Sequence, residues 1–144
     1  MGHEFLDGES VLAFDLETTG ISTNTDRIVQ IALIGSNSTG DTVHYETLVN
    51  PRRPIPPGAS GVHGIFDSDV KGEQDFRHHA DEIHRLIENS VVVGHNIRKF
   101  DMPLLENEFR RIGRLPPKPK AMMDTLEIVR RVKLGRPHNL GSLC

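Results

Sequence analysis

The chain has 144 residues, of which 36% are hydrophobic and 26% are charged, and its formal net charge is −3. This length gives one domain with a substantial core, and the charge excludes a protein whose whole surface is basic enough to coat nucleic acid. No apolar stretch is long enough to cross a membrane, and the single Cys144 excludes an internal disulfide, which agrees with a reducing compartment. We therefore expect one cytoplasmic domain over residues 1–144, with residues 1–9 as a leader or a disordered segment.

Three apolar segments in the first half of the chain predict β-strands. They cover residues 11–16, 27–35 and 41–49. The short connections between them favour an antiparallel meander. The next segment, residues 50–58, contains four prolines and is expected to be irregular and extended. The two glycines at its far side predict a backbone turn over residues 61–64.

The second half of the chain alternates between helical and strand patterns. Apolar residues recur at helical spacing in residues 75–89 and 101–112, and short apolar runs predict strands at 90–93 and 121–123. Asp124 begins a sequence typical of a helix start. Three strands followed by alternating helices and strands predict an α/β domain with a mixed sheet flanked by helices. The final helical pattern ends after about one turn, so we expect the chain to be truncated within its C-terminal helix.

Three acidic side chains follow or end predicted strands. Asp15 and Glu17 are two residues apart on the first strand, so they point to the same face. Asp101 follows a buried strand and a glycine turn, where it can serve as a helix N-cap, as a site residue, or as both. Carboxylates that converge on one sheet edge repel one another unless a divalent cation holds them. An ordinary polar strand end is the alternative for the first two acids.

The chain resembles DnaQ-like (DEDD-type) 3′→5′ exonucleases, a family that includes the proofreading epsilon subunit of bacterial DNA polymerase III. The resemblance rests on four motifs in the family's order, namely FDLETTG, GVHGI, GHNIRKFD and MDTL. It implies a ribonuclease H-like fold and the removal of nucleotides from single-stranded 3′ ends. It also implies that Asp15, Glu17 and Asp101 are catalytic metal ligands for Mg²⁺ or Mn²⁺, with two ions in the complete site.

The same resemblance suggests residues that bind the substrate. His63 is expected either to contact the terminal nucleotide or to support a turn, and Thr18 either to contact the 3′ end or to form its own turn. Asn96 is expected to bond the substrate or to brace its loop. Phe100 is expected to stack on a base or to join the core. Family members often carry an acid five residues before the histidine, where this chain has Gly58.

The family's third motif, a histidine followed five residues later by an aspartate, does not occur in these 144 residues. That histidine would accept a proton from the attacking water, a contribution of roughly 10²–10⁴-fold. We therefore expect this chain, as it stands, to be weakly active or inactive. Two alternatives stay open: an exoribonuclease for short RNA or tRNA ends, and a catalytically dead module that binds nucleic acid or a polymerase subunit.

Positive charge is concentrated in residues 110–136, which contain nine Lys or Arg residues and two acids. A single-stranded DNA backbone could lie along this segment while the acids bind cations. A solvated helix face followed by a basic loop explains the same composition equally well. The segment is therefore a candidate nucleic-acid contact.

Overall fold

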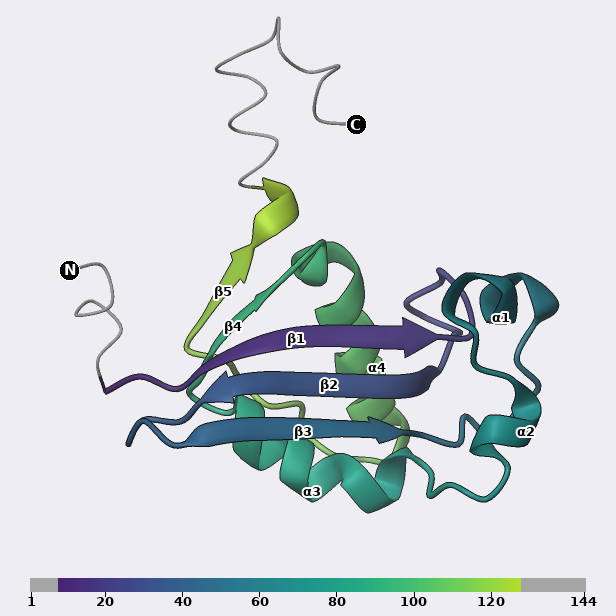
Figure 1. Ribbon diagram of the computed structural model, residues 1–144, viewed down its shortest axis with the longest axis horizontal. Coiled ribbons are helices and arrows are strands. Elements are labelled where there is room, and N and C mark those ends of the chain that lie inside the picture. The colour runs from purple at the N-terminus through teal and green to yellow at the C-terminus, as the bar shows by residue number, and fades with distance from the viewer. Residues whose placement is uncertain (1–7, 128–144) are drawn as a thin grey trace, which may run out of the picture.

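The computed structural model describes residues 8–127, which form a mixed five-stranded sheet with helices packed against it (Figure 1). The elements are, in chain order, β1 (Val11–Thr18), β2 (Ile28–Ser36), β3 (Thr42–Leu48), α1 (Pro57–His63), α2 (Asp67–Val70), α3 (Phe76–Ile87), β4 (Val91–Gly94), the π-helical turn η2 (Ile97–Asp101), α4 (Met102–Arg111) and β5 (Ala121–Asp124). The predicted α/β architecture is confirmed.

The strands lie in the order β3-β2-β1-β4-β5, so β1 is central. β2 pairs antiparallel with both β1 and β3, which confirms the predicted meander. β4 and β5 run parallel to β1, each after a helical crossover. Because parallel neighbours end at the same edge, the chain segments that follow β1, β4 and β5 meet at one end of the sheet.

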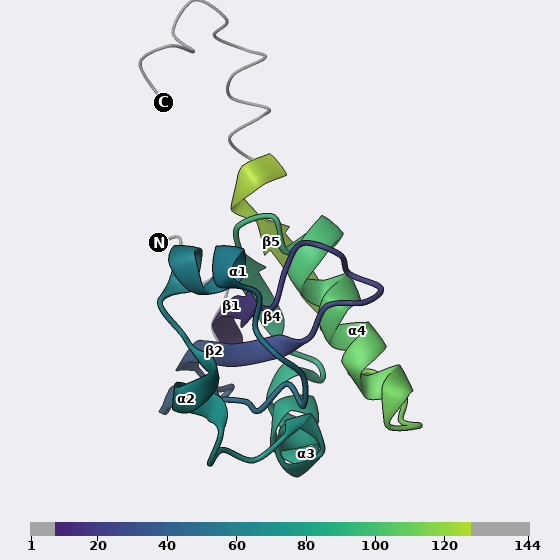
Figure 2. The ribbon, with the colours of Figure 1, turned by 90° about the vertical axis from the view of Figure 1, so that its right-hand side faces the viewer.

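Alternation along β1 separates the core from the exposed face of the sheet. Leu12, Phe14 and Leu16 are buried, whereas Ala13 and Asp15 between them are exposed. The buried side chains pack against α3 and α4, which cover one face of the sheet (Figure 2). The two helices meet through the rings of Phe76 and Phe109, arranged edge to face with centroids 5.0 Å apart.

The segment predicted as a turn at 61–64 is helical instead. α1 begins at Pro57, a position where proline fits because its missing N–H would have no partner within the helix. The helix ends at Gly64, which has a left-handed φ of 74° and whose N–H bonds to Ser60 O. The prediction failed because the prolines and glycines that suggested irregular structure serve as the start and the end of a short helix.

Several predictions fall on residues outside the described range. Only residues 124–127 of the helix predicted to start at Asp124 are described, and the predicted C-terminal helix and the proposed leader lie almost wholly outside residues 8–127. Within the described range, no helix is both long and apolar enough to cross a membrane.

Candidate active site

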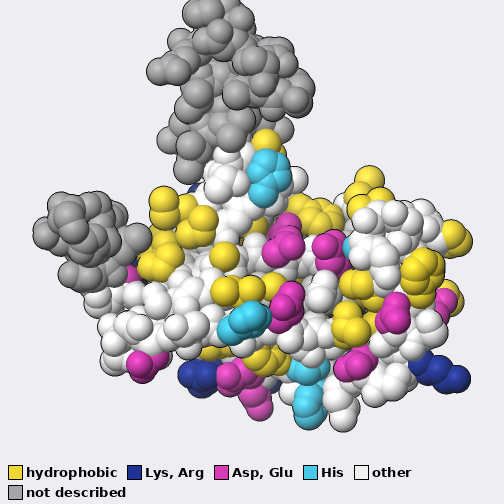
Figure 3. Space-filling view, viewed as in Figure 1, with side chains coloured by type: hydrophobic (Ala, Val, Ile, Leu, Met, Phe, Trp, Pro, Cys, Tyr) yellow, Lys and Arg dark blue, Asp and Glu magenta, His cyan; other side chains and the backbone are white. Residues whose placement is uncertain are grey.

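Asp15 and Glu17 lie on the face of β1 that the helices leave uncovered. In the strand register Asp15 is opposite Ala32, and Ala32 is opposite Glu46, so Glu46 lies on the same face two strands away. Figure 3 shows acidic side chains exposed on this face. The pKa of Glu17 is raised, chiefly by burial and then by the charge of Asp15, while His63 opposes the shift. The two acids therefore interact, as the sequence predicted from their spacing.

Asp101 reaches β1 from the end of η2. The N–H of Leu16 donates a hydrogen bond to Asp101 Oδ2, with 3.2 Å between the nitrogen and the oxygen. Only 5% of Asp101 is exposed. Burial, followed by the charges of Asp15 and Asp124, raises the pKa of Asp101 to about 7 despite the hydrogen bond from Leu16. The third predicted acid is thus held beside the first two.

Asp101 occupies the position before the first residue of α4, as the alternative of a helix cap predicted, but its side chain does not cap the helix. Its backbone is helical, with φ −62° and ψ −47°, and its side chain makes no capping hydrogen bond. The π-helical turn η2 continues directly into α4, so the helix does not start at this residue. The carboxylate is free to bond β1 because the turn that precedes it already supplies helical backbone partners.

The turn that carries Asp101 is fixed by the ends of two neighbouring strands. β4 ends at Gly94, where a Cβ atom would lie 2.6 Å from Phe14 O of β1. Asn96 then adopts a left-handed φ of 57° before η2 begins. The N–H of Asn96 donates to Asp124 Oδ1 (2.9 Å), and the N–H of Arg98 donates to Asp124 Oδ2 (3.1 Å). Asp124 at the end of β5 therefore braces the turn.

Asp124 has two functions in the structure, of which the sequence indicated one. Its Oδ1 also accepts a hydrogen bond from the N–H of Leu126 (3.0 Å), which is the expected helix cap. Burial alone would raise the pKa of Asp124, but the N–H groups of Arg98, Asn96 and Leu126 outweigh burial and lower it. Sequence analysis missed the contact with η2 because the partners are backbone groups some 26–28 residues away.

An apolar groove of about 390 Å³ borders the acids between the end of β1 and α1. Its lining includes Glu17, Thr18, Gly58, His63 and Phe100. Two further lining residues, Ile21 and Val62, are 92% and 86% exposed. Sequence analysis did not select either of them. The available signal was their position, because Ile21 directly follows the motif FDLETTG and Val62 lies within the motif GVHGI.

His63 of α1 and Thr18 of β1 contact each other and so connect the two sides of the groove. His63 Nε2 lies 2.9 Å from Thr18 O, and His63 Nδ1 accepts a hydrogen bond from the N–H of Ile65 (3.1 Å). Because Nδ1 accepts this hydrogen bond, the proton that faces Thr18 O is assigned to Nε2. The Thr18 hydroxyl donates to Gly20 O (2.7 Å). Both polar side chains are therefore occupied by the protein, and His63 offers the groove its ring rather than a free nitrogen.

The other two predicted substrate residues differ in position. Phe100 is partly buried, packs against the core and also lines the groove, so both of its expected roles are compatible with its position. Asn96 does not line the groove. Its backbone contact with Asp124 agrees with the bracing role.

The three acids are ligands of the kind that a hard divalent cation prefers, although in the described residues they do not form a complete metal site. Among residues 8–127, no group of three or more His, Cys, Asp or Glu side chains is close enough together to hold one metal ion. Asp15 nevertheless raises the pKa of both Glu17 and Asp101, so a cation bound among them would relieve their repulsion. Carboxylate oxygens are the ligands that Mg²⁺ and Mn²⁺ prefer.

Much of the basic segment that is described contacts the protein itself. Arg111 donates to Asn24 O and pairs with Glu108, and Arg114 pairs with Asp81. Lys120 pairs with Glu9. The remainder of the segment, from residue 128 onward, lies outside the described range, so a nucleic-acid contact along 110–136 stays a prediction.

Comparison with known proteins identifies the family. A family model described as "Exonuclease" matches residues 12–144. The chain is 31% identical to DNA polymerase III PolC-type of Halalkalibacterium halodurans, over 96% of this chain and 10% of the relative. It is 32% identical to DNA polymerase III subunit epsilon of Treponema pallidum, over 85% of this chain and 56% of the relative. It is also 32% identical to the 3′-5′ exonuclease DinG of Bacillus subtilis, over 86% of this chain and 13% of the relative.

The fold also matches a solved exonuclease. E. coli exonuclease I in complex with a dT13 oligonucleotide superimposes with a TM-score of 0.76 at 24% identity, covering 90% of this chain and 30% of that one. This likeness confirms the predicted ribonuclease H-like fold. The chain spans between about a tenth and just over half of the length of the three relatives above. It belongs to the DnaQ-like exonuclease family, as its four motifs predicted.

Proposed function

We propose that the chain is the catalytic domain of a metal-dependent 3′→5′ exodeoxyribonuclease of the proofreading type. The observation that carries the proposal is the convergence of Asp15, Glu17 and Asp101 beside an apolar groove. A volume of about 390 Å³ lies within the roughly 300–1,000 Å³ of small-molecule sites, which is enough for one terminal nucleoside. The scissile phosphate would then lie next to the acids.

Apolar side chains would hold the terminal nucleoside. Ile21 and Val62 are exposed at the groove, and Phe100 adds an aromatic surface on which a base or sugar can pack. Thr18 and His63 would shape the groove from within, since their polar atoms bond each other and the neighbouring backbone. Such contacts distinguish a frayed single strand from a paired end, because a paired base cannot enter the groove.

Asp15, Glu17 and Asp101 would hold Mg²⁺ or Mn²⁺. When bound, such ions activate water and stabilise the leaving oxygen in phosphodiester hydrolysis. Asp101 is positioned for this role by Leu16 and by the braced turn before it. His63 lies close enough to Glu17 to lower its pKa, yet both ring nitrogens already have partners, so it does not supply the general base. Activity of these 144 residues alone is therefore expected to be low.

DNA is the favoured substrate because the relatives include DNA polymerase III subunits and a structural neighbour was solved with dT13. A polymerase subunit is the corresponding candidate partner. Matched deoxy- and ribo-oligonucleotides test the choice, and faster shortening of the RNA would favour the exoribonuclease alternative.

Asp15→Asn is expected to abolish the 3′→5′ activity of the chain. The test is a 5′-labelled single-stranded DNA with Mn²⁺ and long incubation, in which the wild type should produce a slow ladder that shortens from the 3′ end. Glu46→Gln is the matched control, because it removes an exposed carboxylate from the same sheet face two strands away. Equal ladders from the wild type and Asp15→Asn would contradict the proposed function, as would shortening from the 5′ end.

Gly58→Glu is expected to restore the acid that family members often carry at this position. An added Cβ at Gly58 meets nothing within 4 Å, and the residue lies in the first turn of α1, where a negative charge is favourable. Replacing glycine within a helix should raise the free energy of unfolding by roughly 0.5–1 kcal/mol. Thermal unfolding measures this gain in stability. The KM for single-stranded DNA, which Gly58→Glu should lower, measures the effect of the restored acid. Gly58→Gln should give the stability gain without lowering KM; an equal fall in KM would show that the charge is irrelevant.

A further inference from the structure

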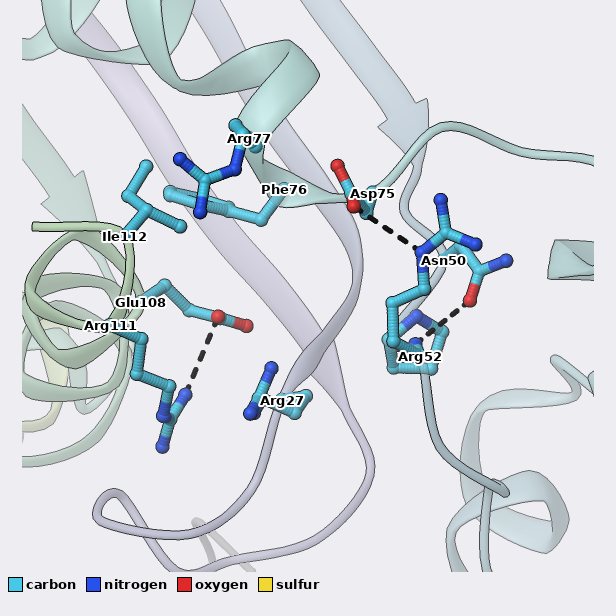
Figure 4. A pocket seen from close by; sticks show the side chains of 10 residues that line it. Arg27, Asn50, Arg52, Asp75, Phe76, Arg77, Glu108, Arg111 and Ile112 are labelled. Atoms are coloured by element: carbon cyan, nitrogen blue, oxygen red, sulfur yellow. Dashed lines mark hydrogen bonds and ion pairs between the residues drawn. The ribbon is translucent and has the colours of Figure 1, made fainter.

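A second, smaller cavity of about 210 Å³ opens on the helix-covered side of the sheet. It lies where the end of α4, the start of α3, the start of β2 and the segment after β3 meet (Figure 4). Because α4 starts at the candidate active site and has 10 residues, the cavity is about 15 Å away along that helix. Four arginines contribute to its lining, namely Arg27, Arg52, Arg77 and Arg111.

Both acids that line this cavity already have hydrogen-bond or ion-pair partners in the protein. Asp75 accepts a hydrogen bond from Arg52 Nε (3.3 Å). Glu108 pairs with Arg111 through Oε1 (3.4 Å), while its Oε2 accepts the N–H of Ile28 (2.9 Å). Four arginines against two acids leave a surplus of two positive charges.

Arg27 and Arg77 carry this surplus. Among the residues that the structure describes, neither forms an ion pair, although the charge of Arg27 acts on the nearby Glu108 and opposes the rise of its pKa by burial. Figure 4 shows Arg27 below the Glu108 carboxylate in the view and Arg77 above it. Within residues 8–127, Arg27 Nε is a buried side-chain atom that has no hydrogen-bond partner. A buried donor without a partner is unfavourable unless a ligand satisfies it.

The start of α3 faces the same cavity through Phe76 and Arg77. The first turn of α3 contains no acid, and Asp75 before it makes no capping hydrogen bond. The helix dipole there adds to the field of the arginines, so both favour an anion. The unpaired Arg27 before β2 and the start of α3 with Arg77 thus come from two separate chain segments, and both favour an anion.

We propose that this cavity binds a phosphate group, with Arg27 and Arg77 as its principal ligands. Arginine forks match phosphate oxygens, and the charge surplus of two suffices for the single charge of a phosphodiester as well as for a phosphate dianion. The volume is below the roughly 300 Å³ of sites that enclose a whole small molecule, so the cavity takes the phosphate and leaves the remainder of its carrier outside. The carrier is either a nucleic-acid strand, which supplies a phosphodiester, or free phosphate or a nucleotide.

The Nε–Hε cross-peak of Arg27 in ¹H–¹⁵N NMR spectra of the full chain is the direct probe. Inorganic phosphate should move this cross-peak in a saturable titration. Arg27→Gln and Arg77→Gln should each weaken phosphate binding by at least about tenfold. Arg85→Gln is the matched control, because Arg85 lies on the same helix but is bonded to Glu82 at 2.6 Å. If Arg27→Gln fails to fold, the wild-type titration and Arg77→Gln still test the site.

A second titration with single-stranded DNA identifies the carrier. If the strand supplies the phosphate, the same cross-peak moves, and Arg77→Gln reduces the salt dependence of DNA binding by roughly 0.7 in slope for one lost contact. If only inorganic phosphate or a nucleoside monophosphate moves it, the site serves a free ligand. An unmoved Arg27 cross-peak in all titrations, or equal weakening by Arg85→Gln, would overturn the proposal. Asp15→Asn should retain phosphate binding here, which separates this site from the proposed exonuclease function.

Discussion

Asp101→Asn is expected to make the metal-free protein more stable at pH 8, by at most about 4 kcal/mol. Burial and two neighbouring acids raise the pKa of Asp101 to about 7 from an ordinary value of 3.8. Above that pH the folded protein holds an ionised carboxylate in a place that disfavours its charge. The asparagine amide carries no charge, and its oxygen can still accept the hydrogen bond from Leu16 N–H.

The direction of the pH dependence follows from the same pKa. Between about pH 4 and pH 7 the unfolded chain loses the Asp101 proton while the folded protein keeps it. The contribution of Asp101 to the free energy of unfolding therefore falls as pH rises through this window, and it is level above the window. Urea unfolding with EDTA at pH 5, 6, 7 and 8 measures the slope. The slope should be smaller in Asp101→Asn than in the wild type, and Glu46→Gln should leave it unchanged.

Divalent cations should reverse the order of stability, so that the wild type becomes more stable than Asp101→Asn. A cation bound among Asp15, Glu17 and Asp101 favours the ionised carboxylates, so Mn²⁺ should stabilise the wild type in proportion to the logarithm of its concentration. The same concentrations of Mn²⁺ should stabilise Asp101→Asn less than the wild type. Equal stabilisation of both proteins by Mn²⁺ would show that Asp101 is not a metal ligand. The expected pattern is a trade between stability and activity, in which a carboxylate that weakens the fold is the one that the chemistry needs.

The elements that the sequence predicted well are those that depend on local periodicity. Strand alternation placed Asp15 and Glu17 on one face because it needs only the neighbouring residues in β1. The same holds for the buried face of α3, where Ala80 and Ile83 follow helical spacing. The capping role expected of Asp101 was wrong because a partner 85 residues away, Leu16 N–H, takes its carboxylate.

The features that the sequence did not predict are assembled from distant segments. The arginine-lined cavity draws Arg27, Arg52, Arg77 and Arg111 from four separate parts of the chain, and no local pattern connects them. The groove could not be predicted without the position of α1. The proline and glycines of this helix suggested irregular structure instead. Local rules therefore identified the acids, whereas their surroundings depend on how the strands and helices come together.

Asp124→Ala is expected to lower the free energy of unfolding by roughly 3–5 kcal/mol and to reduce the proposed exonuclease activity with it. Asp124 is 4% exposed, and its carboxylate accepts the N–H groups of Asn96, Arg98 and Leu126. Alanine would leave these donors without partners. The turn that carries Asp101 would lose its brace, so urea unfolding and DNA shortening should both report the change.

Asp124→Asn separates bracing from a simple loss of volume. The amide keeps one acceptor oxygen for Asn96 and Leu126, but its NH₂ group would face the N–H of Arg98, which is a donor facing a donor. It should therefore be less destabilising than Asp124→Ala, while still moving the backbone amide signals of η2 in NMR spectra. Because Asp124 has a lowered pKa, its contribution in the wild type is present above pH 4 and is lost as pH falls below its ordinary value. Unchanged η2 signals in both variants would show that Asp124 only caps the helix after β5, since loss of a cap alone leaves η2 in place.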